Sequence, residues 1–294
     1  MIQYDPHRWM DHFFDIRGSL VREISGRVLL CTLWSLGVVY FHIYIHPVGI
    51  PSIIHTLVGL ALGLLLVFRT NASYDRFWEG RKLWGGMVNE TRNLIRTSEA
   101  FLSEVPEVRK EIGIWMMAFI YGAMNILRDK KSFGPIASYL DPKEVELAYE
   151  SPHPAMFAAK KISLCLQQAR LSGHINEFVQ ISIDQNVQLL VDYLGGCERI
   201  HRTPLPFAYV VHLRRALIIY CFTLPFALVE LFSWSWAVVF DTLFLSYVFF
   251  GIEEIGVEIE DPFGEDENDL PLEAICDSIF RNTRALLSVS LEKN

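Results

Sequence analysis

Charged residues are missing from one long stretch of this chain. Residues 28–68 contain no Asp, Glu, Lys or Arg, and residues 216–280 contain no Lys or Arg. Over the whole chain 20% of residues are charged and 51% are hydrophobic, whereas an average soluble domain has about 25% charged residues. One helical membrane span needs about 20 mostly apolar residues. The uncharged stretch of 41 residues therefore excludes an ordinary soluble enzyme.

Other absences exclude further classes of protein. No basic stripe of the kind that binds nucleic acid is present. The 5 cysteines are odd in number and include no CxxC pair, so neither a disulfide framework nor a zinc site is indicated. The sequence also lacks a Ser-His-Asp or Cys-His set and a glycine-rich phosphate loop. We therefore expect no enzyme and no required cofactor, and we expect no cleavable signal peptide in residues 1–27.

The apolar stretches divide into four candidate membrane spans. The turn-rich segment 46–51 separates the first two, and a short link at 232–233 separates the last two, the third being broken by Pro225. The spans are expected at residues 28–45, 52–68, 208–231 and 234–252. Apolar residues at helical spacing fill the middle of the chain, and strand-like alternation is hard to find. The predicted fold class is all-α, an integral membrane protein with a helical body at 70–207 and an acidic segment at 253–294.

The positions of Lys and Arg predict which way the spans cross the membrane. Arginines precede the first and third spans and follow the second, and the two short links contain neither Lys nor Arg. Cytoplasmic loops of membrane proteins are enriched in Lys and Arg. We therefore expect a multi-pass protein of the cell (inner) membrane, with both termini and the helical body in the cytoplasm.

The second span carries a row of large apolar residues. Leu60, Leu64 and Phe68 lie four residues apart and share one helix face. Around an axis formed by several copies, they would make stacked apolar rings that gate by dewetting. Ordinary packing or lipid contact is the alternative interpretation. Gly59 and Gly63 have GxxxG spacing, which favours close approach of a second helix.

An acidic loop near the C-terminus is the second candidate site. Residues 261–269 gather acidic side chains and an amide around a glycine turn. Ca²⁺ takes six to eight oxygen ligands from carboxylates and carbonyls. Asp266 and Asp269 are candidate side-chain ligands, although the spacing is not that of an EF-hand. A solvated acidic turn is the alternative.

Several sequence blocks, taken in order, resemble the bacterial branch of the bestrophin family of ion channels, and the resemblance runs over nearly the whole length. They are Arg17-Gly18-Ser19, the segment Phe68–Gly85, Cys197-Glu198-Arg199-Ile200 with Thr203–Tyr209, and Asp261-Pro262-Phe263-Gly264 with Asn268-Asp269-Leu270-Pro271.

The resemblance implies that residues 1–294 form a single bestrophin-like domain and that five copies assemble around a central pore. It implies a pore neck at Leu60, Leu64 and Phe68 and a second, cytoplasmic aperture at Val179. The acidic loop resembles the calcium clasp of animal bestrophins. That likeness implies Asp266 and Asp269 as ligands, helped by the carbonyls of Glu258 and Asp261.

The permeant ion is less well defined by the sequence. An apolar neck offers no charge of either sign, so it cannot select ions by direct ligation. Residues 216–294 hold 14 acidic and 3 basic residues, and such a surplus concentrates cations if it faces the conduit. We therefore expect small monovalent cations such as sodium, with a chloride channel as the alternative. A membrane scaffold or regulatory subunit without conductance is a third interpretation. The expected partners are the lipid bilayer, permeant ions and four further copies of the chain.

Overall fold

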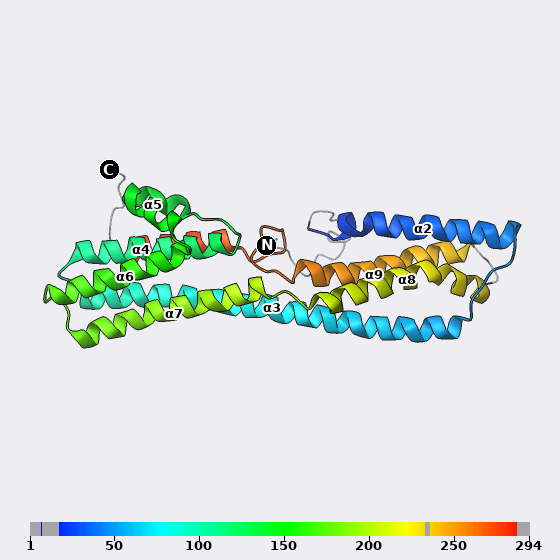
Figure 1. Ribbon diagram of the computed structural model, residues 1–294, viewed down its shortest axis with the longest axis horizontal. Coiled ribbons are helices and arrows are strands. Elements are labelled where there is room, and N and C mark those ends of the chain that lie inside the picture. The colour runs from blue at the N-terminus through cyan, green and yellow to red at the C-terminus, as the bar shows by residue number, and fades with distance from the viewer. Residues whose placement is uncertain (1–6, 8–17, 233–235, 287–294) are drawn as a thin grey trace. The chain divides into compact units, whose positions relative to one another are not determined.

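The computed structural model describes His7, residues 18–232 and residues 236–286. All regular elements in these residues are helices, so the all-α prediction is confirmed for this part of the chain (Figure 1). The chain divides into two compact units. Unit 1 comprises residues 1–77, 204–261 and 266–269, and unit 2 comprises residues 78–203, 262–265 and 270–294. Arg17 and the first residues of the predicted fourth span, 234–235, lie outside the described residues.

Unit 1 is a bundle of apolar helices. It contains α2 (Val21–Tyr44), α8 (Phe207–Leu231), α9 (Ala237–Glu258) and the first part of α3 (Ser52–Phe101). Its core is a cluster of buried apolar side chains that includes Leu62, Leu66, Leu217, Tyr220 and Phe250. Helix α9 packs against both α2 and α8. Burial of this apolar surface stabilises the bundle.

Three helices of the described chain are long and apolar enough to cross a membrane, namely α2, α3 and α8. Helix α9 coincides with most of the predicted fourth span but carries Asp241, Glu253, Glu254 and Glu258 within its 22 residues. These acidic residues keep α9 out of that group, so the count of four spans stays a prediction.

Pro225 does not break the third predicted span. It lies inside α8, which continues to Leu231. Proline lacks the amide hydrogen of the helix and costs about 3 kcal/mol in a water-exposed helix interior. Apolar spanning helices tolerate proline because their neighbours satisfy the freed backbone groups.

Helix α3 runs without a break for 50 residues, well past the expected end of the second span at residue 68. It starts directly after Pro51 and contains no proline of its own. Proline fits the start of a helix and disrupts its interior, so the sequence sets the beginning of α3 and leaves its interior free to continue. Residues 52–77 of this helix belong to unit 1 and the rest belong to unit 2.

Unit 2 is a second helical body. Besides the end of α3 it contains α4 (Pro106–Ile126), the 3-10 helix η1 (Gly134–Tyr139), α5 (Pro142–Glu150), α6 (Pro154–Leu171), α7 (Glu177–Arg202) and α10 (Leu272–Leu286). The side chains of Asp141, His153 and Asn176 cap α5, α6 and α7, and such caps satisfy otherwise free amide hydrogens.

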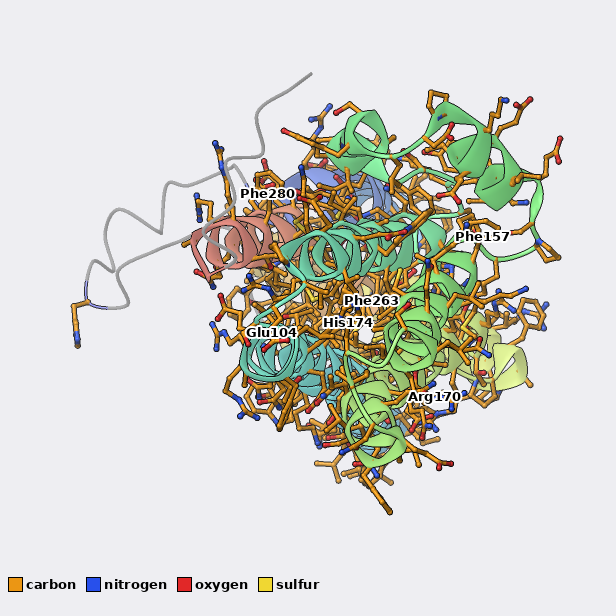
Figure 2. All side chains as sticks on the ribbon, turned by 90° about the vertical axis from the view of Figure 1, so that its left-hand side faces the viewer. Glu104, Phe157, Arg170, His174, Phe263 and Phe280 are labelled. Carbon is orange, nitrogen blue, oxygen red and sulfur yellow. The ribbon has the colours of Figure 1, made fainter. Side chains whose placement is uncertain are left out.

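The core of unit 2 is built on α4, which is buried along most of its length and packs against α6. The loop 262–265 enters this core through Phe263, which is fully buried. Figure 2 draws Phe263 near the middle of the end-on view, among side chains of the surrounding helices. Its ring lies so close to Gly80 of α3 that a Cβ there would be 3.0 Å from Cζ of Phe263. A larger residue at position 80 would force the Phe263 ring or Pro262, whose Cγ would also lie 3.0 Å away, to shift.

Candidate functional site

The row predicted to line a pore lies on the exposed face of α3. Leu60 is 77% exposed, and Leu64 and Phe68 are each 56% exposed, whereas Leu62 and Leu66 on the same helix are buried. Exposed apolar rows of this size mark contact with lipid, with another protein or with a conduit. The structure thus brings the three predicted neck residues together on one free face.

The opposite face of α3 is held to α8 by contacts along its length. His55 Nε2 lies 3.0 Å from Thr223 Oγ1, and the Leu65 carbonyl accepts a hydrogen bond of 3.0 Å from the Tyr209 hydroxyl. Between them, a Cβ at Gly59 would lie 2.5 Å from the Tyr220 hydroxyl oxygen. Gly59 therefore permits close packing within one chain.

Gly63, the other half of the GxxxG pattern, is not in close contact with a second helix. A Cβ added at this position would have no neighbour within 4 Å among the described residues. Gly63 is instead partly exposed. The two glycines therefore do not act as a pair inside unit 1.

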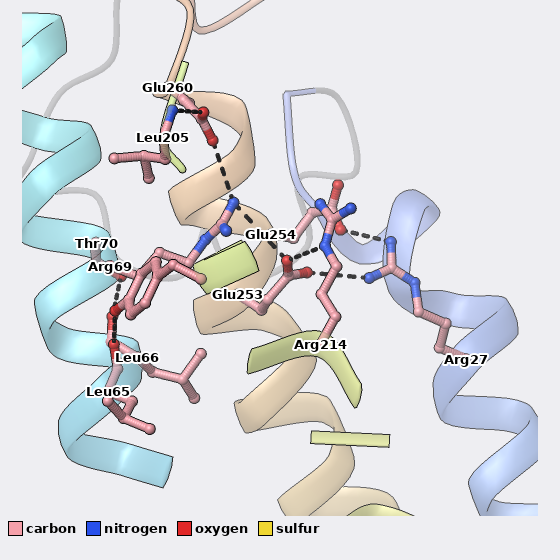
Figure 3. Close-up of polar contacts among 11 residues, drawn as sticks. Arg27, Leu65, Leu66, Arg69, Thr70, Leu205, Arg214, Glu253, Glu254 and Glu260 are labelled. Atoms are coloured by element: carbon pink, nitrogen blue, oxygen red, sulfur yellow. Dashed lines mark hydrogen bonds and ion pairs between the residues drawn. The ribbon is translucent and has the colours of Figure 1, made fainter. Parts of the chain in front are cut away.

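Directly after the neck row, Arg69 turns into the interior of unit 1. Its side chain is 1% exposed, and Nη2 lies 3.5 Å from Glu260 and 3.9 Å from Glu253 (Figure 3). Nε and Nη1 have no hydrogen-bond partner among the described residues. A charge buried this deeply depends on its ion-pair partners, because desolvation costs several kcal/mol.

Glu253 joins three arginines from three helices, as Figure 3 shows. Besides Arg69, it pairs with Arg214 of α8 at 2.8 Å and with Arg27 of α2 at 3.4 Å. Arg27 also pairs with Glu254 at 2.5 Å. We call these five residues the arginine cluster: Arg27, Arg69, Arg214, Glu253 and Glu254. It ties together all four helices of unit 1.

Gly256 on α9 makes room for Arg69. A Cβ at this position would lie 2.9 Å from Nε of Arg69 and 3.5 Å from its Cγ and Cδ. The guanidinium has little freedom to move aside, because it is buried and bound to carboxylates. Glycine is therefore needed at position 256 to leave space for the Arg69 side chain of another helix, and not because the backbone there requires a conformation that favours glycine.

The acidic loop forms a partly buried turn. Asp269 is 3% exposed, and its Oδ2 accepts a hydrogen bond of 2.8 Å from the Asp266 amide. Its Oδ1 has no partner among the described residues. Burial, with the nearby carboxylates of Asp266, Asp261 and Glu258, raises the pKa of Asp269 to about 6. The turn thus contains a buried carboxylate oxygen aimed at no donor.

The surroundings of this turn are polar. Asn268 donates to Glu258 at 3.1 Å and to the Gly18 carbonyl at 3.3 Å. A cavity of about 770 Å³ borders the turn and is lined by Glu258, Asp261 and Asp266 among others. No cluster of three His, Cys, Asp or Glu side chains close enough to hold a metal occurs in the described part of the chain. A cation here would need backbone oxygens as well as Asp266 and Asp269.

Arg128 fixes the other end of the loop within unit 2, a role that sequence reasoning missed. Its Nε and Nη2 donate to the carbonyls of Phe263 and Gly264 at 3.1 and 2.9 Å. It also pairs with Glu273 and, at 3.6 Å, with Glu265. Arg128 lowers the pKa of Glu273, and Lys130, with a smaller contribution from Arg128, lowers that of Glu265. The loop follows Arg128 by 135 residues, so no local pattern could link them.

Val179, the predicted cytoplasmic aperture, lies in the first turn of α7 in unit 2. Its amide donates to Asn176 Oδ1 at 2.9 Å, and its side chain is partly exposed. Phe178 beside it is 82% exposed. An apolar pair therefore lies at a capped helix start.

Part of the acidic surplus of residues 216–294 is paired with bases from earlier in the chain. Glu253, Glu254, Glu265 and Glu273 all form ion pairs with arginines of α2, α3, α8 or the segment after α4. The count by segment therefore overstates the negative charge that an ion would meet, which weakens the argument for cations.

Both the sequence and the helical fold of this chain resemble those of known proteins. Residues 1–285 match the family model described as bacterial/fungal bestrophin protein. The chain belongs to the bestrophin family. Its helices also superpose on a bacterial bestrophin homologue from Klebsiella pneumoniae with a TM-score of 0.83 and 31% identity. That likeness covers 90% of this chain and 98% of the other.

Related sequences carry names that state an activity. A voltage-dependent anion channel-forming protein of Nostoc sp. is 40% identical over 286 residues, covering 96% of this bestrophin and 92% of the relative. One of Synechocystis sp. is 38% identical over 288 residues, covering 97% and 93%. The family and these names support an ion channel in a membrane and not an enzyme.

Proposed function

We propose that this bestrophin forms a homopentameric channel that conducts small monovalent anions passively across the inner membrane. The observation that carries the proposal is the exposed row Leu60, Leu64 and Phe68 on a helix whose other face is packed. Five copies of that row around an axis would form three stacked apolar rings. Such a constriction controls conduction by dewetting.

The membrane arrangement that we propose uses α2, α3, α8 and α9 as four spans. Between residues 237 and 252, α9 contains a single charged residue, Asp241. Arg27 and Arg214 lie near the starts of α2 and α8, and Glu253 lies near the end of α9. The link at 46–51, which joins the end of α2 to the start of α3, contains no Lys or Arg. By the positive-inside rule the cluster is cytoplasmic, and so are both termini.

Anions are preferred over cations for two reasons. The relatives are named anion channel-forming proteins, and four glutamates of the acidic C-terminal region are already paired with arginines. Sodium conduction remains the alternative, because the neck itself is uncharged. Val179 is proposed as a second aperture on the cytoplasmic side.

We also propose Ca²⁺ as an optional ligand of the acidic loop. The buried, unpartnered Oδ1 of Asp269 and the neighbouring Asp266 carboxylate are hard oxygen donors of the kind that Ca²⁺ prefers. Carbonyls of Glu258 and Asp261 would complete the set. Bound Ca²⁺ would supply charge compensation, and the loop itself would be held by Arg128.

The deciding experiment is bilayer recording of the purified protein in asymmetric sodium chloride. A reversal potential near the chloride equilibrium potential supports anions, and one near the sodium potential supports the alternative. Bilayers that stay silent, with correctly assembled protein, would instead support a scaffold or regulatory subunit.

The neck is tested with Leu64→Ala. Shortening this side chain widens the ring, so we expect conductance to rise at least twofold. Val58→Ala is the matched control, since Val58 is 44% exposed on the same helix but lies about 120° from Leu64 and about 80° from Phe68 around the helix axis, at about 3.6 residues per turn. Equal effects of both substitutions would rule out this neck.

A further inference from the structure

A groove on unit 1 has a composition that the channel function does not explain. It is a cavity of about 380 Å³ between α2, α8 and α9. Its walls are apolar at one end, where Leu30, Ile218, Phe222 and Phe250 line it. They are charged at the other end, where four members of the arginine cluster line it: Arg27, Arg214, Glu253 and Glu254. Pockets of about 300–1,000 Å³ hold small ligands. A cavity with apolar side chains at one end and charged side chains at the other suits an amphiphilic ligand.

The charged end presents cations to a ligand. The side chains of Arg27 and Arg214 are 42% and 49% exposed, whereas those of Glu253 and Glu254 are 2% and 13% exposed. The carboxylates thus lie behind the guanidiniums. All four side chains line the cavity, and the two guanidiniums are the more exposed of them, so a headgroup would meet the arginines first.

Hydrogen-bond donors remain available there. Arg214 uses Nε for Glu253 at 2.8 Å, and its two Nη groups have no partner within the described chain. Arg27 uses Nη1 and Nη2, and its guanidinium carbon lies 5.8 Å from the centre of the Phe250 ring. The free Nη groups of Arg214, which shares Glu253 with Arg27, match a phosphate, which accepts paired N–H bonds from arginine.

We propose that this groove binds an anionic phospholipid, with its phosphate on Arg27 and Arg214 and one acyl chain along Ile218 and Phe222. Basic pockets between spanning helices on the cytoplasmic side are suited to anionic headgroups. The proposal rests on the membrane placement proposed above and does not require that the protein conduct ions. A lipid is the expected occupant because the surrounding leaflet supplies it at high concentration.

The first test measures binding to the purified full-length protein in non-ionic detergent by native mass spectrometry. Dioleoyl-phosphatidylglycerol is compared with dioleoyl-phosphatidylcholine, which has the same acyl chains. We expect phosphatidylglycerol to saturate at one molecule per chain and to bind at least tenfold more tightly. Both lipids offer a phosphate, but the choline cation of phosphatidylcholine is repelled by the two arginines, whereas the glycerol headgroup adds no positive charge. Equal affinity for the two lipids overturns the proposal.

The headgroup contact is tested with Arg214→Gln. The matched control is Arg215→Gln, which removes the same charge from the next residue, an exposed arginine that does not line the cavity. We expect the first change to weaken phosphatidylglycerol binding about tenfold and the second by less than about twofold. The same loss in both variants would mean non-specific attraction to a basic surface and would refute the site.

A second pair of variants leaves the ion pairs intact, which matters because Arg214→Gln also removes a partner of the buried Glu253. Ile218→Trp should fill the groove and abolish saturable binding, whereas Ile219→Trp, at a neighbouring exposed residue outside the lining, should retain it. If Ile218→Trp alters the oligomer on gel filtration and leaves lipid affinity unchanged, the groove is a contact between subunits and the proposal is wrong. The assay measures lipid binding and not current. A negative result would therefore refute the lipid site without bearing on the channel proposal.

Discussion

The arginine cluster allows a sharp prediction for Glu253→Gln. This substitution keeps the size of the side chain and removes its charge. Arg27 and Arg214 are 42% and 49% exposed, so water solvates them once they lose their partner, and each pair contributes at most about 1 kcal/mol. Arg69 is different, because its side chain is 1% exposed and keeps only Glu260, at 3.5 Å.

Removing one partner of a buried ion pair costs about 3–5 kcal/mol. Since Glu260 remains, we take the lower end and expect a loss of about 3 kcal/mol. At about 2–4 °C per kcal/mol this lowers the unfolding temperature by about 6–12 °C. Glu254→Gln is the control, because Glu254 pairs only with the half-exposed Arg27 among the described residues. It should lower the unfolding temperature by no more than about 4 °C.

The assay is thermal unfolding of the purified protein in detergent, followed by tryptophan fluorescence. A rescue variant separates the stranded charge from other causes. Combining Glu253→Gln with Arg69→Met removes the buried guanidinium, and the double variant should be more stable than Glu253→Gln alone. The reasoning is refuted if Glu253→Gln and Glu254→Gln are equally destabilising, or if Arg69→Met makes the loss larger.

Two further predictions concern unit 2 and the acidic loop. Gly80→Ala should lower the unfolding temperature, since its Cβ would lie 3.0 Å from buried Phe263. Gly85→Ala, whose Cβ would meet only the tip of Arg81 at 3.3 Å, should raise the unfolding temperature through helix propensity. If both variants shift the unfolding temperature in the same direction, the packing argument is wrong. For Asp269, a pKa raised to about 6 means that the folded state holds an extra proton between about pH 4 and pH 6, so the stability present below pH 4 is lost as the pH rises through 6. Asp269→Asn in chelator should therefore be more stable than the parent at pH 7.5, by roughly 3 kcal/mol, and the difference should vanish near pH 4. A constant difference at both pH values would contradict a raised pKa.

Much of the helical layout was predictable from the sequence. The uncharged stretch and the turn at 46–51 predict two helices, and α2 and α3 lie there. Apolar spacing similarly predicts helices in the middle of the chain, where α4 and α6 lie. The extent of α3 was not predictable from hydropathy, because its apolar part ends at Phe68 while its backbone continues to Phe101. Helix continuity depends on the absence of proline and on packing, and not on the hydrophobic pattern.

The sites were predictable only in part. A row such as Leu60, Leu64 and Phe68 follows from helical periodicity, and the structure places it on one exposed helix face. That it lines a conduit stays a prediction. The role of Glu253 did not follow, since the sequence suggested only the start of a cytoplasmic extension. Its partners Arg27 and Arg214 are 226 and 39 residues away, and contacts of that range arise from tertiary packing.

The close approach of Gly256 to Arg69 has a consequence for how this protein can change over evolutionary time. A side chain at position 256 is compatible with the fold only after Arg69 has been replaced by a residue that leaves space, because its Cβ would lie 2.9 Å from the guanidinium nitrogen. Loss of Arg69 would in turn leave Glu253 and Glu260 with one cation fewer. The two positions should therefore covary among bestrophins, with glycine at 256 wherever arginine is inherited at 69.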